Sequence, residues 1–244
     1  MSVRERPIII QAESVRAILA GRKTQTRRVV KPQPGDVLPP IRVEEYEPVR
    51  VDRNGEEYAG EPIFGAYSAD GEWGVRCPYG APGDRLWVRE AWRPWFNESE
   101  YAVVQYRADG ATRKPEGLDV ATGWHFAHEC DYATDESPWR SPLFMPRWAS
   151  RLTLEITDVR VQRLQEISEQ DAEAEGIVRV DDIGDGNTAP AYAGTDGSFT
   201  NGWSAQSALA RVWDAINGRR FPWSANPWVW AVTFKRVEMA HVST

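Results

Sequence analysis

The sequence predicts an α+β protein in which a mixed β-sheet curls into a small barrel with helices beside it. Five or more segments have the alternating or β-branched composition of strands, whereas only a few have helical periodicity. The two kinds of segment do not alternate regularly, as they would in a doubly wound α/β fold. With 244 residues, 41% of them hydrophobic, the chain can form one large core, so we expect a single domain over 1–244 with long insertions.

The first three elements are a strand, a helix and a second strand. Residues 6–10 are mostly apolar and predict a strand, and residues 13–20 have apolar side chains at helical spacing. Gly21 then offers the left-handed conformation that ends many helices. Residues 23–30 alternate around β-branched side chains and predict the second strand, which the Pro-rich residues 31–35 end.

Two insertions separate the strands in the middle of the chain. Residues 32–83 are rich in Pro, Gly and Glu and show little periodicity, which predicts a long surface insertion. Residues 84–92 and 101–107 predict two further strands. The turn-rich residues 109–147 form the second insertion.

The longest strand signal covers residues 151–164. Its apolar residues change phase at Thr157 and Asp158, which predicts a β-bulge of the kind that turns the corner of a small barrel. Ser168, followed three residues later by Asp171, then caps a short helix.

The C-terminal part begins with a Gly- and Asp-rich stretch. Residues 178–202 predict a mobile loop, the third insertion. Residues 205–216 have apolar side chains at helical spacing and predict a helix. Residues 228–234 alternate and predict a last strand in the centre of the sheet.

Charge is distributed unevenly along the chain. The net charge is −7, but residues 1–31 carry eight basic side chains against two acidic ones, so the remainder is strongly acidic. This asymmetry favours a local anion site on a body that repels polyanions. We therefore expect a compact ligand such as a nucleoside, or a short single-stranded RNA, and not an extended duplex.

Cysteine content and hydropathy predict a cytoplasmic protein without a membrane span. Cys77 and Cys130 are too few for a disulfide framework, and the N-terminus lacks an apolar signal region. The apolar runs are far shorter than the ~18 residues that a membrane helix needs. His125 and His128, taken with the two cysteines, match no compact zinc pattern, so we expect no metal and no cofactor.

The strongest candidate site lies where the first helix ends and the second strand begins. Gly21 permits a tight turn near a ligand, Lys23 supplies a movable cation, Thr26 a hydroxyl that can act as a nucleophile, and Arg28 a planar fork for anionic oxygens. Neighbouring cations, Arg22 among them, would lower the pKa of Lys23 toward that of a general base. The simpler alternative is a solvated basic hairpin.

The helix and the following segment GRKTQTRR, residues 21–28, resemble the signature of the ASCH family, whose general pattern is G-x-K-x-x-E-x-R. The resemblance implies a PUA-like small mixed β-barrel. Thr26 stands where most members have Glu, which is also the pattern of small ASCH enzymes that hydrolyse N4-acetylcytidine. In those enzymes the signature Lys and Thr are joined by a Glu on a later helix. That residue corresponds to Glu175 here, with Glu173 as the alternative in a shifted register.

Motifs outside this segment extend the resemblance over the whole chain. They are similar to those of ASCH proteins encoded by phages and prophages, and they occupy residues 6–8, 77–80, 82–90 and 145–151. The compact ASCH enzymes lack the long insertions of this chain. The wider resemblance therefore informs the fold more than the activity.

Three functions follow from these observations. The sharpest is an amidohydrolase that removes an N4-acyl group from cytidine, with Lys23, Thr26 and Glu175 as catalytic residues. The alternatives are a non-catalytic binder of RNA or of a modified nucleobase, of phage origin, and an accessory protein of a phage without a small ligand. Lys23 and Thr26 would point to opposite faces of a regular strand, so the enzyme requires Lys23 to lie in the turn before the strand.

Weaker signals add three possible ligand contacts. Trp87 and Glu90 are placed to line a pocket, where the indole would stack on a base. A buried carboxylate paired with Arg89 or Arg85 is the alternative for Glu90. Asn226 lies in a turn beside the last strand, where it would meet a base edge or simply stabilise the turn.

Overall fold

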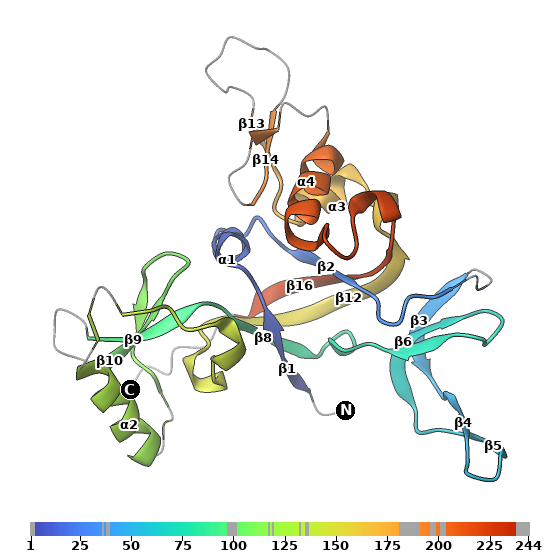
Figure 1. Ribbon diagram of the computed structural model, residues 1–244, viewed down its shortest axis with the longest axis horizontal. Coiled ribbons are helices and arrows are strands. Elements are labelled where there is room, and N and C mark those ends of the chain that lie inside the picture. Colours follow the sequence, from blue (N-terminus) through green and yellow to red (C-terminus); the bar gives the residue numbers. More distant parts are fainter. Residues whose placement is uncertain are drawn as a thin grey trace.

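Figure 1 shows a central β-sheet with helices above it and a smaller β-rich lobe at each end. Helices and strands follow one another in an irregular order, so the predicted α+β class is confirmed. This computed structural model describes residues 3–35, 37, 40–96, 102–116, 118, 120–131, 133–134, 137–180, 191–195, 199–200 and 204–237.

A five-stranded sheet forms the centre of the molecule, in the order β1-β8-β12-β16-β2. Strands β1 and β8 run parallel, and the other neighbouring pairs are antiparallel. All five confirm strands expected from the sequence, and β16 lies inside the sheet as expected. Their bounds are Glu5–Ile9 (β1), Arg85–Arg89 (β8), Thr153–Arg163 (β12), Trp228–Val237 (β16) and Gln25–Val29 (β2).

The two longest strands show how the sequence shapes this sheet. The pairing of β12 with β16 shifts register between Ile156 and Asp158, which confirms the predicted bulge. Along β16 the side chains alternate between two hydrophobic clusters. Trp230 and Val232 are buried in the main core, whereas Val229 belongs to a second cluster on the opposite face.

The sheet is open, with β1 and β2 at its edges, and the described residues contain no closed barrel. The two edge strands are nevertheless linked. Helix α1 (Ala12–Leu19) connects them in the chain, and Arg28 Nη2 of β2 donates a hydrogen bond to the Ile9 carbonyl of β1 at 2.7 Å. The described residues therefore show an open sheet whose edges are tied by a side chain, and the barrel stays a prediction.

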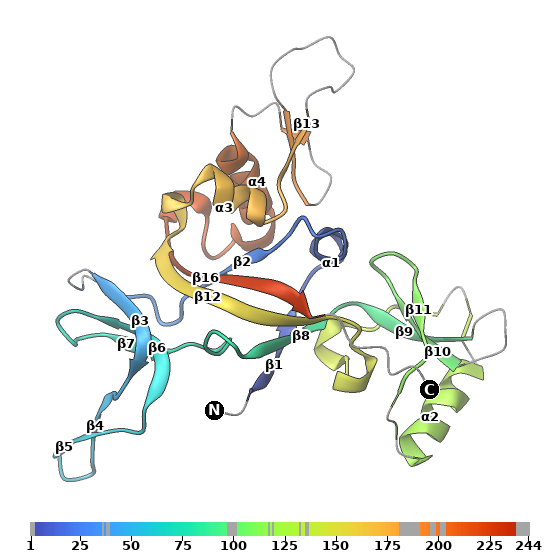
Figure 2. The ribbon, with the colours of Figure 1, turned by 180° about the vertical axis from the view of Figure 1, so that it is seen from behind.

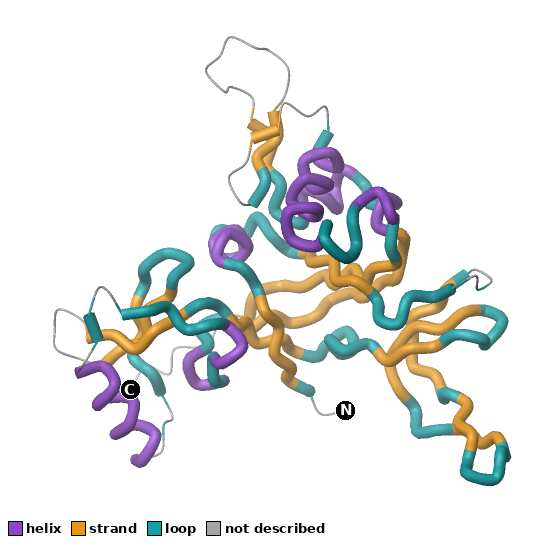
Figure 3. The backbone as a smooth tube through the Cα atoms, in the orientation of Figure 1, coloured by secondary structure: helices purple, strands orange, loops and turns teal. Residues whose placement is uncertain are grey.

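Helices α1, α3 and α4 lie on the same side of the sheet, as the labels of Figure 1 and the purple segments above the sheet in Figure 3 show. Helix α1 ends at Leu19, and the φ of 72° at Gly21, two residues later, confirms the predicted left-handed stop. Helices α3 (Glu169–Ala174) and α4 (Ala205–Asn217) share a hydrophobic cluster. Ser168 caps α3 through a 3.0 Å bond from the Asp171 amide, also as predicted.

The first insertion is more regular than the sequence suggested. Residues 32–83, in which no strand was predicted, contain two small antiparallel sheets, β3-β6-β7 and β4-β5. The strands are short and carry many charged side chains, so little apolar periodicity distinguishes them. Their bounds are Ile41–Tyr46 (β3), Val49–Val51 (β4), Glu57–Ala59 (β5), Ile63–Ser68 (β6) and Gly74–Arg76 (β7).

The second lobe lies at the other end of the sheet, as the view from behind in Figure 2 shows. It contains the sheet β11-β10-β9, with helix α2 packed on β9 and β10. Strand β9 was not predicted separately because it follows β8 after only two residues. The bounds are Trp92–Phe96 (β9), Ala102–Tyr106 (β10), Thr112–Arg113 (β11) and Val120–Asp131 (α2).

The third insertion forms a small sheet near α4. Its strands are β13 (Val178–Val180), β14 (Ala191–Ala193) and β15 (Phe199–Thr200). Most of the loop predicted at 178–202 lies outside the described residues. Short 3-10 turns at Pro142–Phe144, Arg147–Ala149, Leu164–Glu166 and Trp223–Ala225 complete the described elements. Among the described helices, none is long and apolar enough to cross a membrane.

Candidate functional site

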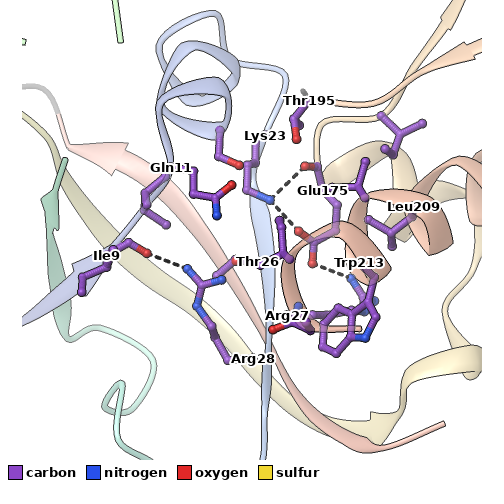
Figure 4. A pocket seen from close by; sticks show the side chains of 16 residues that line it. Ile9, Gln11, Lys23, Thr26, Arg27, Arg28, Glu175, Thr195, Leu209 and Trp213 are labelled. Carbon is purple, nitrogen blue, oxygen red and sulfur yellow. Dashed lines mark hydrogen bonds and ion pairs between the residues drawn. The ribbon is translucent and has the colours of Figure 1, made fainter. Parts of the chain in front are cut away.

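A cavity of about 290 Å³ opens between the start of α1, strand β2, the end of α3 and helix α4 (Figure 4). Lys23, Thr26 and Glu175 line it together with Arg28. The opposite wall is apolar and comes mainly from α4, with Trp213 as its largest side chain. A flat, apolar wall facing a few polar groups is typical of sites for small planar ligands.

Lys23 lies in the turn between α1 and β2, where the proposed chemistry requires it. The amides of Arg22 and Lys23 both donate to the Ala17 carbonyl, at 2.9 and 3.1 Å, and the Thr24 amide donates to the Ala174 carbonyl at 2.9 Å. Strand β2 begins only at Gln25. Lys23 is therefore outside the strand alternation and lines the same cavity as Thr26.

Glu175 is the direct partner of Lys23. Lys23 Nζ donates to Glu175 Oε2 at 2.5 Å and to the Glu175 backbone carbonyl at 2.9 Å. Both side chains are buried, with 5% and 7% of their surface exposed. Glu173, the alternative in a shifted register, is exposed at the surface. The structure thus brings Glu175, and not Glu173, to Lys23.

Gly176 permits this close approach. Its φ is +97°, and a Cβ at this position would lie 3.3 Å from Lys23 Cβ and 2.8 Å from Thr195 Cγ2. A side chain would therefore be strained by its backbone conformation and would also meet the wall of the site. The glycine that ends α3 is what allows Glu175 and Lys23 to pack together.

Arg27 supplies a second cation to the same carboxylate. Its Nη1 bonds Glu175 Oε1 at 3.2 Å and its Nη2 bonds Asp171 Oδ2 at 3.1 Å. Gln25, two residues earlier on β2, also bonds Arg27 and Asp171, at 2.5 and 3.2 Å. Arg160 pairs with Asp171 from the exposed side. Strand β2 and helix α3 are thus held together by a polar network behind the cavity.

The surroundings of Lys23 lower its pKa from the usual value of a lysine. Burial lowers the pKa of Lys23; the Glu175 charge opposes that shift, and the nearby Arg28 and Arg27 charges reinforce it. Lys23, Arg27 and Glu175 are the most deeply buried charges of the site, two positive and one negative. Loss of the Lys23 proton therefore leaves the buried Glu175 carboxylate still paired with Arg27.

The remaining residues of the predicted segment take different positions. Arg28 lines the cavity, and its hydrogen bond to Ile9 fixes the guanidinium at the cavity wall. Gly21 and Arg22 are exposed in the turn and are not among the described lining residues. For Lys23 Nζ, the hydrogen bonds within the described chain go to Glu175 and not to the Thr26 hydroxyl.

The three weaker candidates lie outside the described lining of this cavity. Trp87 lies on β8, with Arg89 5.3 Å from its ring. Glu90 is a buried carboxylate, but its partner is Arg151, at 2.8 Å, in place of the two arginines considered from the sequence. Burial raises the pKa of Glu90, and the bonds from Arg151 oppose that shift.

Asn226 has a structural place in its turn. It adopts a left-handed conformation, with φ 44° and ψ 54°, at the end of a 3-10 turn. Its side-chain oxygen accepts a 2.8 Å bond from the Gln165 amide. The side chain therefore ties this turn to the 3-10 turn Leu164–Glu166 that follows β12, as in the structural alternative considered above.

Sequence reasoning missed the polar network and the apolar wall. Arg27 was treated only as part of a basic cluster and Asp171 only as part of a helix cap. Two spacings in the sequence could have indicated the network. Asp171 and Glu175 are four residues apart in a helical segment, and Gln25 and Arg27 are two residues apart on a strand. Each spacing places both side chains on one face.

The comparisons with known proteins add no assignment. No family model, no curated protein and no solved structure matches the chain. In the described part of the chain, no three His, Cys, Asp or Glu side chains gather in a way that could hold a metal ion. The chemistry of the site must therefore be argued from its own side chains.

Proposed function

We propose that the cavity binds a modified cytidine base and that the protein is an amidohydrolase that removes an N4-acyl group. The observation that carries this proposal is the buried Lys23–Glu175 pair, which opens onto a cavity also lined by Thr26. These three residue types at these positions are the ones that the resemblance to ASCH enzymes implies. The reaction class is acyl transfer to a hydroxyl, followed by hydrolysis.

The architecture supports the PUA-like part of the proposal. A five-stranded mixed sheet carries a bulge in its longest pair, and its edge strands are consecutive in the chain around α1. The bond from Arg28 to Ile9 ties those edges at the cavity wall. We propose that this arrangement is a PUA-like barrel of the ASCH type.

Lys23 has the properties of a general base. A lysine must be neutral to accept a proton, and burial together with two arginines favours the neutral amine. Glu175 is not left unpaired when Lys23 is neutral, because Arg27 stays bonded to it. Glu175 therefore positions the Lys23 nitrogen through two oxygens while its own charge remains satisfied.

The reaction proceeds in two halves. Neutral Lys23 accepts the Thr26 hydroxyl proton as Thr26 Oγ1 attacks the acyl carbonyl, and Arg28 or a backbone N–H stabilises the oxyanion. The Lys23 ammonium then gives that proton to the departing N4 nitrogen, which releases cytidine and leaves an acyl ester on Thr26. Lys23 next accepts a proton from the water that attacks the ester, and the resulting ammonium gives this proton to the departing Thr26 Oγ1. The carboxylic acid is then free, and the Thr26 hydroxyl and the neutral Lys23 amine are restored.

The apolar wall gives the base a place to bind. The indole of Trp213 and the side chain of Leu209 line the cavity opposite Lys23, as Figure 4 shows. Flat aromatic surfaces stack on nucleobases. Gln11 and Ser14, at the start of α1, line the same cavity and are polar groups suited to a base edge.

Substitution of Thr26 tests the proposal. Thr26→Val keeps the shape of this buried side chain but removes the nucleophile, so kcat/KM for N4-acetylcytidine should fall by roughly 10³-fold or more, whereas Thr26→Ser should retain turnover. Thr24→Val, at an exposed position two residues away, is the matched control. Full turnover by folded Thr26→Val would eliminate Thr26 as the nucleophile.

A further inference from the structure

A second cavity adjoins the first and is strongly basic. It measures about 640 Å³ and shares Arg27, Arg28, Ile216 and Asn217 with the Lys23 cavity. Together the two volumes lie within the ~300–1,000 Å³ typical of sites for small ligands. The two cavities are therefore neighbours, with the same side chains on the walls of both.

Five cationic side chains at least partly open to solvent line this second cavity, and we call them the basic groove. They come from three separate parts of the chain: the end of β2, the end of β7 and the residues that follow α4. No Asp or Glu is among its described lining residues. The five residues are Arg28, Lys31, Arg76, Arg219 and Arg220.

Within the part of the chain that the structure describes, no carboxylate pairs with the cations of the basic groove. None of the five forms an ion pair with a described residue. Lys31 Nζ instead lies 5.8 Å above the Phe221 ring, and Arg28 donates to the Ile9 carbonyl. Five cations around one hollow repel one another when, as among the described residues, no carboxylate pairs with them. The net charge of −7 shows that the chain has more than enough carboxylates to pair with them.

A purely structural role does not account for this cluster. Arg219 and Arg220 follow the C-terminus of α4, where cations stabilise a helix dipole. The helix dipole does not explain Lys31 and Arg76, which come from other segments and line the same groove. A cluster of cations assembled from distant segments is better explained by an anionic ligand.

We infer that the basic groove binds the phosphate of a nucleotide whose base occupies the Lys23 cavity, so that the substrate is a phosphorylated or strand-linked cytidine in place of the free nucleoside. The inference rests on the proposed function only in placing the base. Arg28 lines both cavities and stands where base and phosphate would meet. The groove holds few cations on an acidic body, which suits a single strand of a few nucleotides and not a duplex.

Binding of an unmodified strand tests the groove without any turnover. The probe is a fluorescein-labelled single-stranded oligocytidine of a few nucleotides, followed by anisotropy at several salt concentrations. Single strands lose affinity with a slope of ~0.7 per neutralised phosphate, so Arg219→Gln/Arg220→Gln should lower the slope by about 1.4 and the affinity at 0.1 M salt by roughly 25-fold. Arg50→Gln/Arg53→Gln, in the exposed β4–β5 hairpin, is the matched control and should change neither.

Turnover gives an independent measurement. N4-acetylcytidine 5′-monophosphate should be hydrolysed with a kcat/KM about tenfold or more above that of N4-acetylcytidine, and the groove variant should bring this ratio toward one. Equal kcat/KM for the two substrates, with oligocytidine binding unchanged in the groove variant, would overturn the phosphate site and leave the hydrolase standing. Oligocytidine binding that weakens in the groove variant, without any deacylation by wild type, would overturn the hydrolase and leave the phosphate site standing. Duplex binding as tight as single-strand binding would also overturn the inference.

Discussion

Glu175→Gln is expected to destabilise the fold in a way that depends on pH. The substitution keeps the size of the side chain and one acceptor oxygen but removes the negative charge that Lys23 and Arg27 share. Two buried cations then face a neutral amide. Glu173→Gln, at an exposed position on the same helical segment, changes the net charge identically and serves as the control.

The magnitude follows from burial and from the titration of Lys23. Breaking a buried pair by removing one partner costs about 3–5 kcal/mol, and the lower end applies because Asp171 still pairs with Arg27. Glu175→Gln is expected to relieve the remaining repulsion between Lys23 and Arg27 by releasing the Lys23 proton. The pKa of Lys23 is already lowered by burial, and without the Glu175 charge it falls further.

The sign of the pH dependence follows from proton linkage. Between the folded and unfolded pKa of Lys23, the unfolded chain binds one more proton, so the free energy of unfolding rises with pH, by at most ~1.4 kcal/mol per unit. This window begins at a lower pH in Glu175→Gln, so its destabilisation relative to wild type should shrink as the pH rises between the two folded pKa values of Lys23. Urea unfolding of the three proteins over a series of pH values measures it. A loss no greater than that of Glu173→Gln, or one that is equal at every pH of the series, would refute this reasoning.

Two further predictions concern the same site. Gly176→Ala should lower the free energy of unfolding by more than Gly71→Ala does. Both glycines have positive φ, but only at position 176 would a Cβ lie 3.3 Å from Lys23 and closer still to Thr195. Equal losses for the two variants in urea titrations would contradict this packing effect. The acid limb of kcat/KM should have an apparent pKa below the usual 10.5 of a lysine, because burial and two arginines favour the neutral amine. Arg27→Gln should move that limb to higher pH, and a limb that does not move would show that Lys23 is not the titrating base.

Local signals in the sequence predicted the elements that carry the site. The stop at Gly21, the strand after Lys23 and the bulge near Thr157 each depend on a few neighbouring residues, so single-sequence patterns reveal them. The pairing of Lys23 with Glu175 spans 152 positions and came from the family resemblance, not from spacing.

The parts that were missed depend on contacts between distant segments. Arginine side chains are mostly exposed in proteins, so the sequence does not indicate that Arg27 is buried. Only the packing of Arg27 against α3 shows that it is buried next to Asp171. Strand β3 carries Glu44 and Glu45, so its short apolar pattern of Ile41 and Val43 was too weak to predict a strand. The basic groove joins segments from three parts of the chain, and no local window contains it.

The most direct test of the central claim is incubation of wild-type protein and Lys23→Met with a panel of N4-acylated cytidines, read by mass. Methionine fills the volume of the buried lysine stem without an amine, and circular dichroism checks that the variant is folded. Wild type should convert N4-acetylcytidine or its 5′-monophosphate to the deacylated product, and Lys23→Met should not. Absence of conversion of every panel member by wild type, or unchanged conversion by Lys23→Met, would contradict the account.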